Sequence, residues 1–246
     1  MLSLNRYMFR RVLSTTRVST SAKKKTVEDM TQEMLQTPVS KVPAAIQRLA
    51  SSLRLKFKSD GLDQSVKSIL DRASAQLYYN CADNYDFQLL CKAFGLGDYM
   101  SSWYKLTLMH VWMVLMRLHS EFDGKAYMRL QRGLLSTMWL DIDHRLGIVS
   151  KELNQVMTGQ NDMKHMHGLH LQTFFEYDEG FLHDDRVLAG AIWRCLYMNR
   201  EFDPVHLLKV VTYIRSTIAW LETQDTNTIL IQGIPEWKQL RHNHTS

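Results

Sequence analysis

The chain has 246 residues, of which 45% are hydrophobic and 22% are charged, with eleven glycines and four prolines. This composition is typical of one globular domain or two small ones, and it excludes collagen-like, disulfide-scaffold and wholly disordered proteins. The formal net charge is +5, but residues 1–27 hold seven basic side chains and no acid, which leaves 23 basic and 25 acidic side chains elsewhere. A body with a net charge of −2 is not expected to bind DNA.

The N-terminal residues 1–25 have the composition of a mitochondrial transit peptide. They are rich in Arg, Ser and Thr, contain no acid, and lack the continuous apolar core of a secretory signal. The alternative is a disordered basic tail that binds RNA or a membrane surface. Residues 26–62 are predicted to form a linker with a possible short helix, and residues 239–246 a flexible tail.

Residues 63–238 have the apolar periodicity of helices almost without interruption, with apolar side chains at spacings of three and four. The first expected helix begins at Asp63. The others are expected at residues 86–94, 99–119, 125–146, 149–158, 162–176, 185–199 and 204–222. Only residues 228–233 (TILIQG) are typical of a strand, and one short strand cannot form a sheet. The predicted fold class is all-α, a single multi-helix domain of about seven helices preceded by the transit peptide and the linker.

The helix expected at residues 99–119 contains LTLMHVWMVLM, in which nine of eleven residues are apolar. This pattern predicts a helix that is buried on most of its circumference, at the core of the domain. Lys105, His110 and Arg117 interrupt the run, which is therefore too short for the roughly 20 apolar residues of a membrane span. Asp184 and Asp203 stand where an N-cap is expected, and Pro204 follows at the first helical position.

The three cysteines, Cys81, Cys91 and Cys195, form no CxxC pair, so neither a disulfide framework nor a zinc ribbon is expected. The chain also lacks the GxGxxG, GxxxxGK[ST], HExxH and GxSxG motifs. It has no CxxCH motif for haem attachment. No cofactor, resident metal or catalytic residue is predicted.

One cluster of metal-ligand types remains, DMKHMHGLH, with Asp162, His165, His167 and His170. On a helix His165 and His167 are about 200° apart, whereas His167 and His170 share a side. The alternatives are a zinc or copper site and an ordinary helix surface, and the second is favoured.

An acid–base pair is the other chemical candidate. His110 lies in the apolar helix, and Asp141, Asp143 and His144 follow in DIDH. A structural hydrogen bond of a buried His110 is favoured over catalysis, because buried polar groups need partners in any case.

The segment YDEGFLHDDRVLAGAIWRCLY, residues 177–197, places four acids around a predicted glycine turn ahead of an apolar helix: Asp178, Glu179, Asp184 and Asp185. One interpretation is a helix connection whose acids favour the positive end of the next helix. The other is an acidic surface loop for docking.

Four long strings resemble the ubiquinol-cytochrome c chaperone family: LTLMHVWMVLMRL (106–118), MWLDID (138–143), residues 177–197, and DPVHLLKVVTYIRSTIAWLE (203–222). The resemblance covers about residues 65–238. It implies an assembly factor for mitochondrial complex III that pairs with a small helical partner, associates with the mitochondrial ribosome, and holds newly made cytochrome b until haem and further subunits arrive. It also implies a location on the matrix side of the inner membrane, in peripheral contact with it, and no catalysis.

A chaperone for a hydrophobic membrane protein needs an adaptable apolar surface, and Met and Trp suit such surfaces. The contact residues expected for a partner or client are therefore Trp103, Tyr104, Met109, Trp112 and Met113, together with Tyr177 and the four acids. The alternatives are a matrix metal-binding protein or enzyme that uses residues 162–170, and an RNA-binding module of the mitochondrial ribosome that uses Arg54, Lys56 and Lys58.

Overall fold

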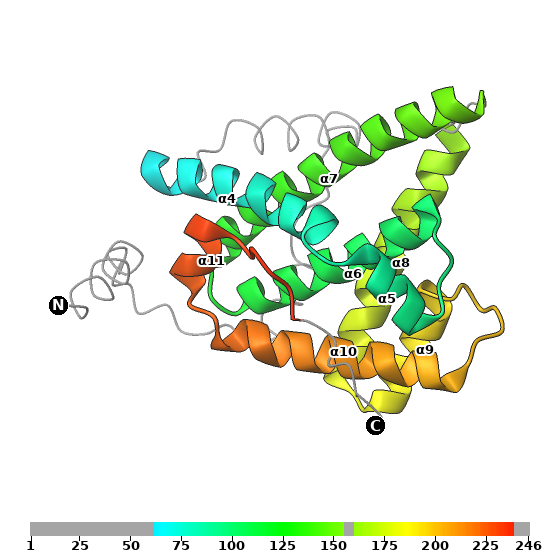
Figure 1. Cartoon of the computed structure of the whole chain (residues 1–246). Helices are drawn as coiled ribbons and strands as arrows, with labels where there is room; N and C mark the ends of the chain where they lie inside the picture. The colour runs from blue at the N-terminus through cyan, green and yellow to red at the C-terminus, as the bar shows by residue number, and fades with distance from the viewer. Residues whose placement is uncertain (1–61, 155–159, 239–246) are drawn as a thin grey trace, which may run out of the picture. The chain divides into compact units, whose positions relative to one another are not determined.

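The computed structural model describes residues 62–154 and 160–238. The chain divides into two units at Lys58 and Ser59, and the described residues belong to the second. The predicted transit peptide, the tail at 239–246 and all but the last residue of the linker lie outside them. Eight helices make up the described part (Figure 1): α4 (Gln64–Asp83), α5 (Phe87–Phe94), α6 (Met100–His119), α7 (Gly124–Leu153), α8 (Gln160–Leu182), α9 (Asp185–Cys195), α10 (Pro204–Thr223) and α11 (Thr226–Gln232).

The all-α prediction is confirmed, and the described residues contain no strand. The strand expected at 228–233 is wrong, because residues 228–232 belong to α11 and Gly233 is its C-cap. Asp225 caps this helix by accepting a hydrogen bond from the Thr228 amide. Periodicity alone cannot distinguish a short buried helix from a buried strand. The Asp225 cap is a local feature that favours the helix.

Three predicted helix boundaries are also wrong. The break expected between residues 146 and 149 does not exist, since α7 continues through Gly147. Helix α8 continues to Leu182, beyond the predicted end at residue 176. Helix α9 ends at Cys195 because Met198 and Asn199 adopt left-handed backbone angles, with φ of 57° and 58°.

Aspartate side chains cap six of the eight described helices at their N-termini. Each accepts a backbone N–H of the first turn, which satisfies a donor that has no partner within the helix. The six are Asp63, Asp86, Asp123, Asp184, Asp203 and Asp225. The caps predicted at Asp184 and Asp203 are therefore confirmed.

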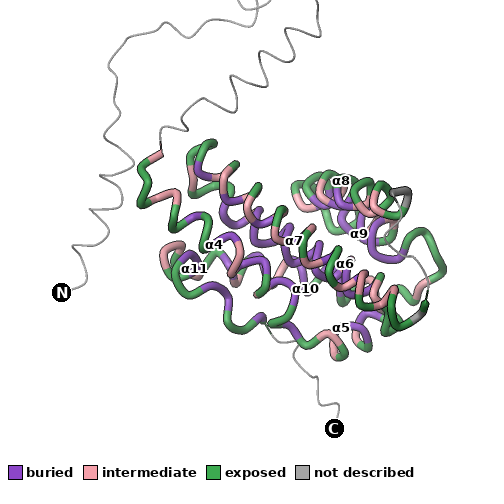
Figure 2. The backbone as a smooth tube through the Cα atoms, turned by 90° about the horizontal axis from the view of Figure 1, so that it is seen from above, coloured by how far each residue is buried: buried purple, intermediate pink, exposed green. Residues whose placement is uncertain are grey.

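Helix α6 is the core of the described unit, as predicted. Fifteen of its twenty residues are buried, because α4, α7, α8 and α10 all pack against it. Buried residues follow the inner sides of the surrounding helices and exposed residues the outer sides (Figure 2). In residues 62–154 and 160–238 no helix has the length and hydrophobicity to cross a membrane.

Helices α4 and α7 lie side by side and run in the same direction. Arg129 of α7 forms an ion pair with Asp71 near the start of α4, and Arg145 forms one with Asp83 at its end. Between these pairs the Tyr78 hydroxyl donates to the Asp141 carboxylate at 2.6 Å. These side-chain contacts join the two helices into one layer, which packs against one side of α6.

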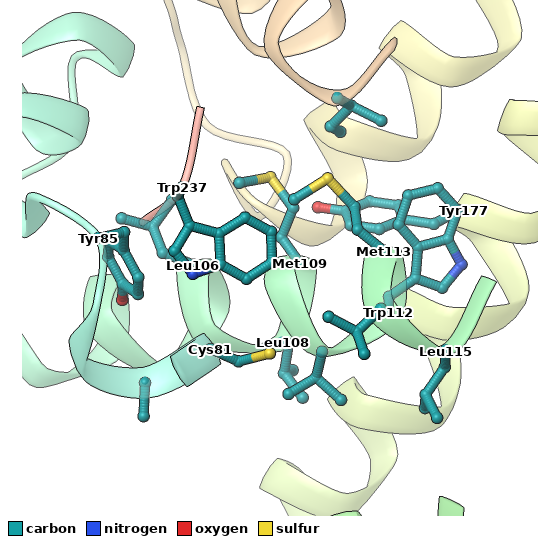
Figure 3. Close-up of a cluster of buried hydrophobic side chains, with 14 of the residues drawn as sticks. Cys81, Tyr85, Leu106, Leu108, Met109, Trp112, Met113, Leu115, Tyr177 and Trp237 are labelled. Atoms are coloured by element: carbon teal, nitrogen blue, oxygen red, sulfur yellow. The ribbon is translucent and has the colours of Figure 1, made fainter. Parts of the chain in front are cut away.

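Residues 233–238 follow α11 and close the core beside α4. The Trp237 indole donates to the Asn80 carbonyl at 2.8 Å, and the Ile234 amide donates to the Asn80 side chain at 2.9 Å. Gly233 has φ of +74°, and a Cβ there would clash with the Asn80 side-chain oxygen. The Trp237 ring lies in the buried cluster with Tyr85 and the α6 side chains (Figure 3).

Candidate interaction surface at the α8–α9 corner

The four predicted acids lie on the corner where α8 ends and α9 begins, and all four are exposed. Asp178 and Glu179 belong to the last turns of α8, Asp184 caps α9, and Asp185 is the first residue of α9. The glycine turn predicted between them is wrong, because Gly180 is helical. The acids therefore project from two helices that meet at a sharp corner, and not from one loop.

Gly180 is required by close packing and not by a turn. A Cβ at this position would lie 2.8 Å from the Leu188 Cα and 3.2 Å from its backbone nitrogen. Helices α8 and α9 thus approach each other closely at this point, and Arg194 of α9 forms an ion pair with Glu176 of α8 nearby. Close backbone packing and this ion pair both stabilise the contact between α8 and α9.

Arg215 of α10 binds both helices of the corner. Its guanidinium donates to the Phe181 carbonyl at 2.7 Å, to the His183 carbonyl at 2.9 Å and to the Asp185 carboxylate at 3.0 Å. It also lies over the Phe181 ring, 4.7 Å from its centroid. The last carbonyls of a helix lack partners within the helix, so one arginine both satisfies them and fixes the entry into α9.

Asp178 connects the exposed corner to the core. Its carboxylate accepts a hydrogen bond of 2.8 Å from the indole N–H of Trp112, whose side chain is buried. Trp112 in turn contacts Tyr177 and Phe181 edge-on, with ring centroids 5.3 and 5.9 Å apart. Burial raises the pKa of Tyr177 well above its ordinary value, so it stays a neutral phenol. Asp178 therefore presents a carboxylate held in a fixed position.

The aromatic and Met residues expected as an exposed contact surface lie inside the core. Trp103, Tyr104, Met109, Trp112 and Met113 are 0–8% exposed, and Tyr177 is 1% exposed. The reason is the central position of α6, and Figure 3 shows Met109, Trp112, Met113 and Tyr177 packed together. These six side chains are therefore part of the core. Of the ten residues expected to contact a partner or client, the four acids are the exposed ones in the described fold.

A group of exposed apolar side chains on α8 was not predicted: Leu171, Phe175 and Leu182 are 66%, 72% and 76% exposed. The available signal was their spacing of four and seven, which places them on one side of a helix. A helix that ends at the predicted residue 176 does not include Leu182, which the longer α8 adds to the same face.

The candidate metal ligands of residues 162–170 do not lie together. His170 is 6% exposed and packs edge-on against Trp139 and Phe174, whereas His165 and His167 are exposed. His167 stacks on Trp139, with ring centroids 3.7 Å apart. Burial lowers the pKa of His170 to about 4. Within the described ranges no group of three or more His, Cys, Asp or Glu side chains could hold a metal ion.

His110 makes the structural hydrogen bonds that sequence analysis favoured. Its Nδ1 lies 2.8 Å from the Leu106 carbonyl, and its Nε2 lies 2.8 Å from the Tyr213 hydroxyl. A carbonyl only accepts, so Nδ1 carries the proton and Nε2 accepts from Tyr213. Asp141 is not its partner, because that carboxylate accepts from Tyr78 and Arg145.

The other two members of the acid–base candidate, Asp143 and His144, are exposed residues of α7. The structure therefore does not bring them to the buried His110. The basic run of Arg54, Lys56 and Lys58 proposed for RNA binding lies outside the described residues.

A surface hollow of about 250 Å³ lies between α6, α8 and α10, lined by Met116, Arg117, Ser120, Glu121, Phe181, Ile218 and Glu222. Phe181 connects it to the acidic corner. Its volume is below the roughly 300–1,000 Å³ of small-molecule sites. Its lining combines the apolar side chains of Met116, Phe181 and Ile218 with the charged side chains of Arg117, Glu121 and Glu222.

Fold and surface together define an all-helical domain with an acidic corner and exposed apolar side chains on α8. Residues 92–237 match the ubiquinol-cytochrome C chaperone family, and the chain belongs to that family. The matched range extends from α5 to Trp237 and includes the whole corner.

Curated relatives agree with this membership. The chain is 33% identical over 171 residues to ubiquinol-cytochrome-c reductase complex assembly factor 1 of Xenopus laevis, covering 68% of this chain and 82% of the relative. It is 32% identical over 168 residues to the Homo sapiens protein of that name, covering 68% of this chain but 54% of the relative. It is also 33% identical over 119 residues to the mitochondrial protein CBP3 of Saccharomyces cerevisiae, covering 48% and 35%. No solved structure matches the chain.

Proposed function

We propose that this protein is an assembly factor for ubiquinol-cytochrome c reductase, the mitochondrial complex III, and that it acts as a chaperone by binding and release. The observation that carries the proposal is the family match over residues 92–237. The printed names of its relatives, assembly factor 1 of that reductase complex, support the same role. The proposed client is newly synthesised cytochrome b, held near the mitochondrial ribosome until haem and further subunits are added.

The proposed setting is the matrix side of the inner membrane, in peripheral contact with it, together with a small helical assembly-factor partner. The transit peptide predicted at residues 1–25 supports a mitochondrial location, as does the name of the yeast relative. The contact surface proposed for a partner or client consists of the four corner acids, because they are exposed while Arg215 and Trp112 hold the corner in place.

The experiment is a pull-down of the tagged full chain from gently solubilised mitochondria after pulse labelling of mitochondrial translation. Labelled cytochrome b and a small helical protein are expected in the eluate. Recovery of neither, from protein that is folded and imported, would overturn the proposal.

A variant pair tests the corner in the same assay. Asp178→Asn with Glu179→Gln removes two corner charges, and recovery of the client or partner is expected to fall several-fold. Asp143→Asn with Glu152→Gln removes two exposed acids from α7 and is the matched control, which is expected to bind like the wild type. Equal recovery from both double variants would show that the corner acids are not the contact surface.

A further inference from the structure

Helix α8 has one buried side and one exposed side. The buried side packs into the core through His170, Thr173, Tyr177 and Gly180. Leu171, Phe175 and Leu182 lie on the other side, and at 100° per residue they fall within about 40° of one another. We call these three residues the α8 stripe. Exposed residues follow the outer side of α8 in Figure 2.

The α8 stripe is more than scattered surface hydrophobicity. Single exposed apolar side chains are normal on a soluble protein and need no explanation. Here three large ones, 66–76% exposed, follow one line over three helical turns. Burial of apolar surface favours association, so a partner that covers the line gains affinity from all three side chains.

Asp178 interrupts the α8 stripe between Phe175 and Leu182, and Glu179 lies beside it. Asp178 and Glu179 follow Phe175 by three and four residues and precede Leu182 by four and three, so both are its neighbours on the helix surface. The Trp112 indole that holds Asp178 is a neutral donor and leaves its charge in place. Asp184 continues the negative charge beyond the end of the stripe, whereas the charge of Asp185 is offset by its ion pair with Arg215.

The apolar stripe and the nearby acids together favour one kind of binding partner over others. Anionic lipid headgroups and RNA phosphates are repelled by the acids, which disfavours a membrane or a nucleic acid. A second copy of this chain would bring the same acids against each other. An amphipathic helix with apolar residues on one side and Lys or Arg beside them satisfies both the apolar line and the negative rim.

We infer that the α8 stripe is a docking face for an amphipathic helix with basic flanks in a partner protein. The inference rests on the proposed function, since it names the chemistry of one protein that the assembly factor binds. Leu171 and Leu182 are eleven residues apart, or about 16 Å along the helix axis. The partner helix is therefore at least about eleven residues long, with apolar side chains at spacings of three, four and seven.

The first test uses a synthetic 21-residue helical peptide of Leu and Lys in this pattern as the probe, and a Leu and Glu peptide as its counterpart. Binding to the full chain is measured by fluorescence anisotropy. The Lys peptide is expected to bind at least tenfold more tightly than the Glu peptide. Comparable affinity of the two peptides would overturn the inference.

The variants for this test are Phe175→Ser with Leu182→Ser, and Leu140→Ser as the matched control. Leu140 lies on α7 and is 73% exposed, so the control removes an equally exposed leucine outside the α8 stripe. The double variant is expected to weaken binding of the Lys peptide at least tenfold, and the control to leave it unchanged. Equal weakening by both would refute the assignment to α8.

The second test places a photo-crosslinking amino acid at position 175 or 140 of the full chain in mitochondria. A crosslink from 175 to a Lys- or Arg-flanked helical segment of another protein supports the inference. Crosslinks only to lipid, to a second copy or to residues 26–61 of the same chain overturn it. The two proposals can also fail separately. Cytochrome b can still copurify with the double variant although the Lys peptide no longer binds to it. In that case the α8 stripe is not the client site, and the proposed assembly-factor role is retained. If the peptide binds but no complex III protein copurifies, the proposed function fails alone.

Discussion

Substitution of His110 by Gln is expected to reduce the loss of folding stability that occurs between pH 7 and pH 5. Burial lowers the pKa of His110 to about 4, whereas an unfolded histidine titrates near 6.5. Between those pH values the unfolded chain binds the proton and the folded chain does not, so stability falls as the pH falls. At pH 5 only about one folded molecule in ten carries this proton, and the loss from pH 7 to pH 5 is about 2 kcal/mol.

The structure explains why the folded state resists this proton. The ring is stacked on Tyr85 with centroids 4.4 Å apart, and Trp237 lies edge-on at 4.4 Å. Its only acceptor role is toward the Tyr213 hydroxyl. Protonation would turn Nε2 into a donor facing that hydroxyl and would place an uncompensated charge in the core.

The assay is urea unfolding of the full chain, followed by circular dichroism at pH 7 and pH 5. His110→Gln is less stable than the wild type at pH 7 because ring packing is lost, but its decline between the two pH values is expected to be smaller by about 2 kcal/mol. His144→Gln removes an exposed imidazole from α7 and is expected to follow the wild type. The contribution of the buried His170 is common to all three proteins and cancels. Parallel declines of His110→Gln and the wild type would refute the reasoning.

Four further substitutions test individual packing statements by thermal and urea unfolding. Gly180→Val forces the α8 backbone away from Leu188 and should cost about 1–3 kcal/mol, whereas Gly147→Ala meets no atom within 4 Å and should stabilise by about 0.5–1 kcal/mol; the reverse order would contradict the close approach at the corner. Trp237→Ala should cost about 3 kcal/mol, because it empties a buried site and removes the bond to α4; a cost below 1 kcal/mol would show that residues 233–238 do not close the core. Asp184→Ala should cost about 1 kcal/mol through loss of the α9 cap, and an unchanged midpoint would contradict that cap.

Local signals in the sequence predict much of this fold. The aspartate caps at Asp184 and Asp203 and the burial of the helix at 100–119 depend on neighbouring residues, and both appear in the structure. The strand expected at 228–233 and the break expected after residue 146 were wrong for the same reason. A short apolar run or a single glycine has several local structures open to it, and tertiary contacts select among them.

The candidate surface was harder to predict than the fold. Charge alone placed Asp178 and Glu179 outside, because an ionised side chain is costly to bury. The exposure of Trp112 and Met113 could not be inferred, since a helix that is apolar on all sides can lie at the centre of a bundle or bind a client. Gly180 was read as a turn because its real constraint comes from Leu188, a residue of the following helix.

The bond between Trp237 and Asn80 joins residues that are 157 positions apart in the chain. Contacts that close so long a loop form late, after local helices and short hairpins. A chain that emerges N-terminus first from a ribosome, or passes N-terminus first through a narrow channel, exposes Tyr85 and His110 to water until residue 237 arrives. The domain can therefore complete its core only after residue 237 has been delivered.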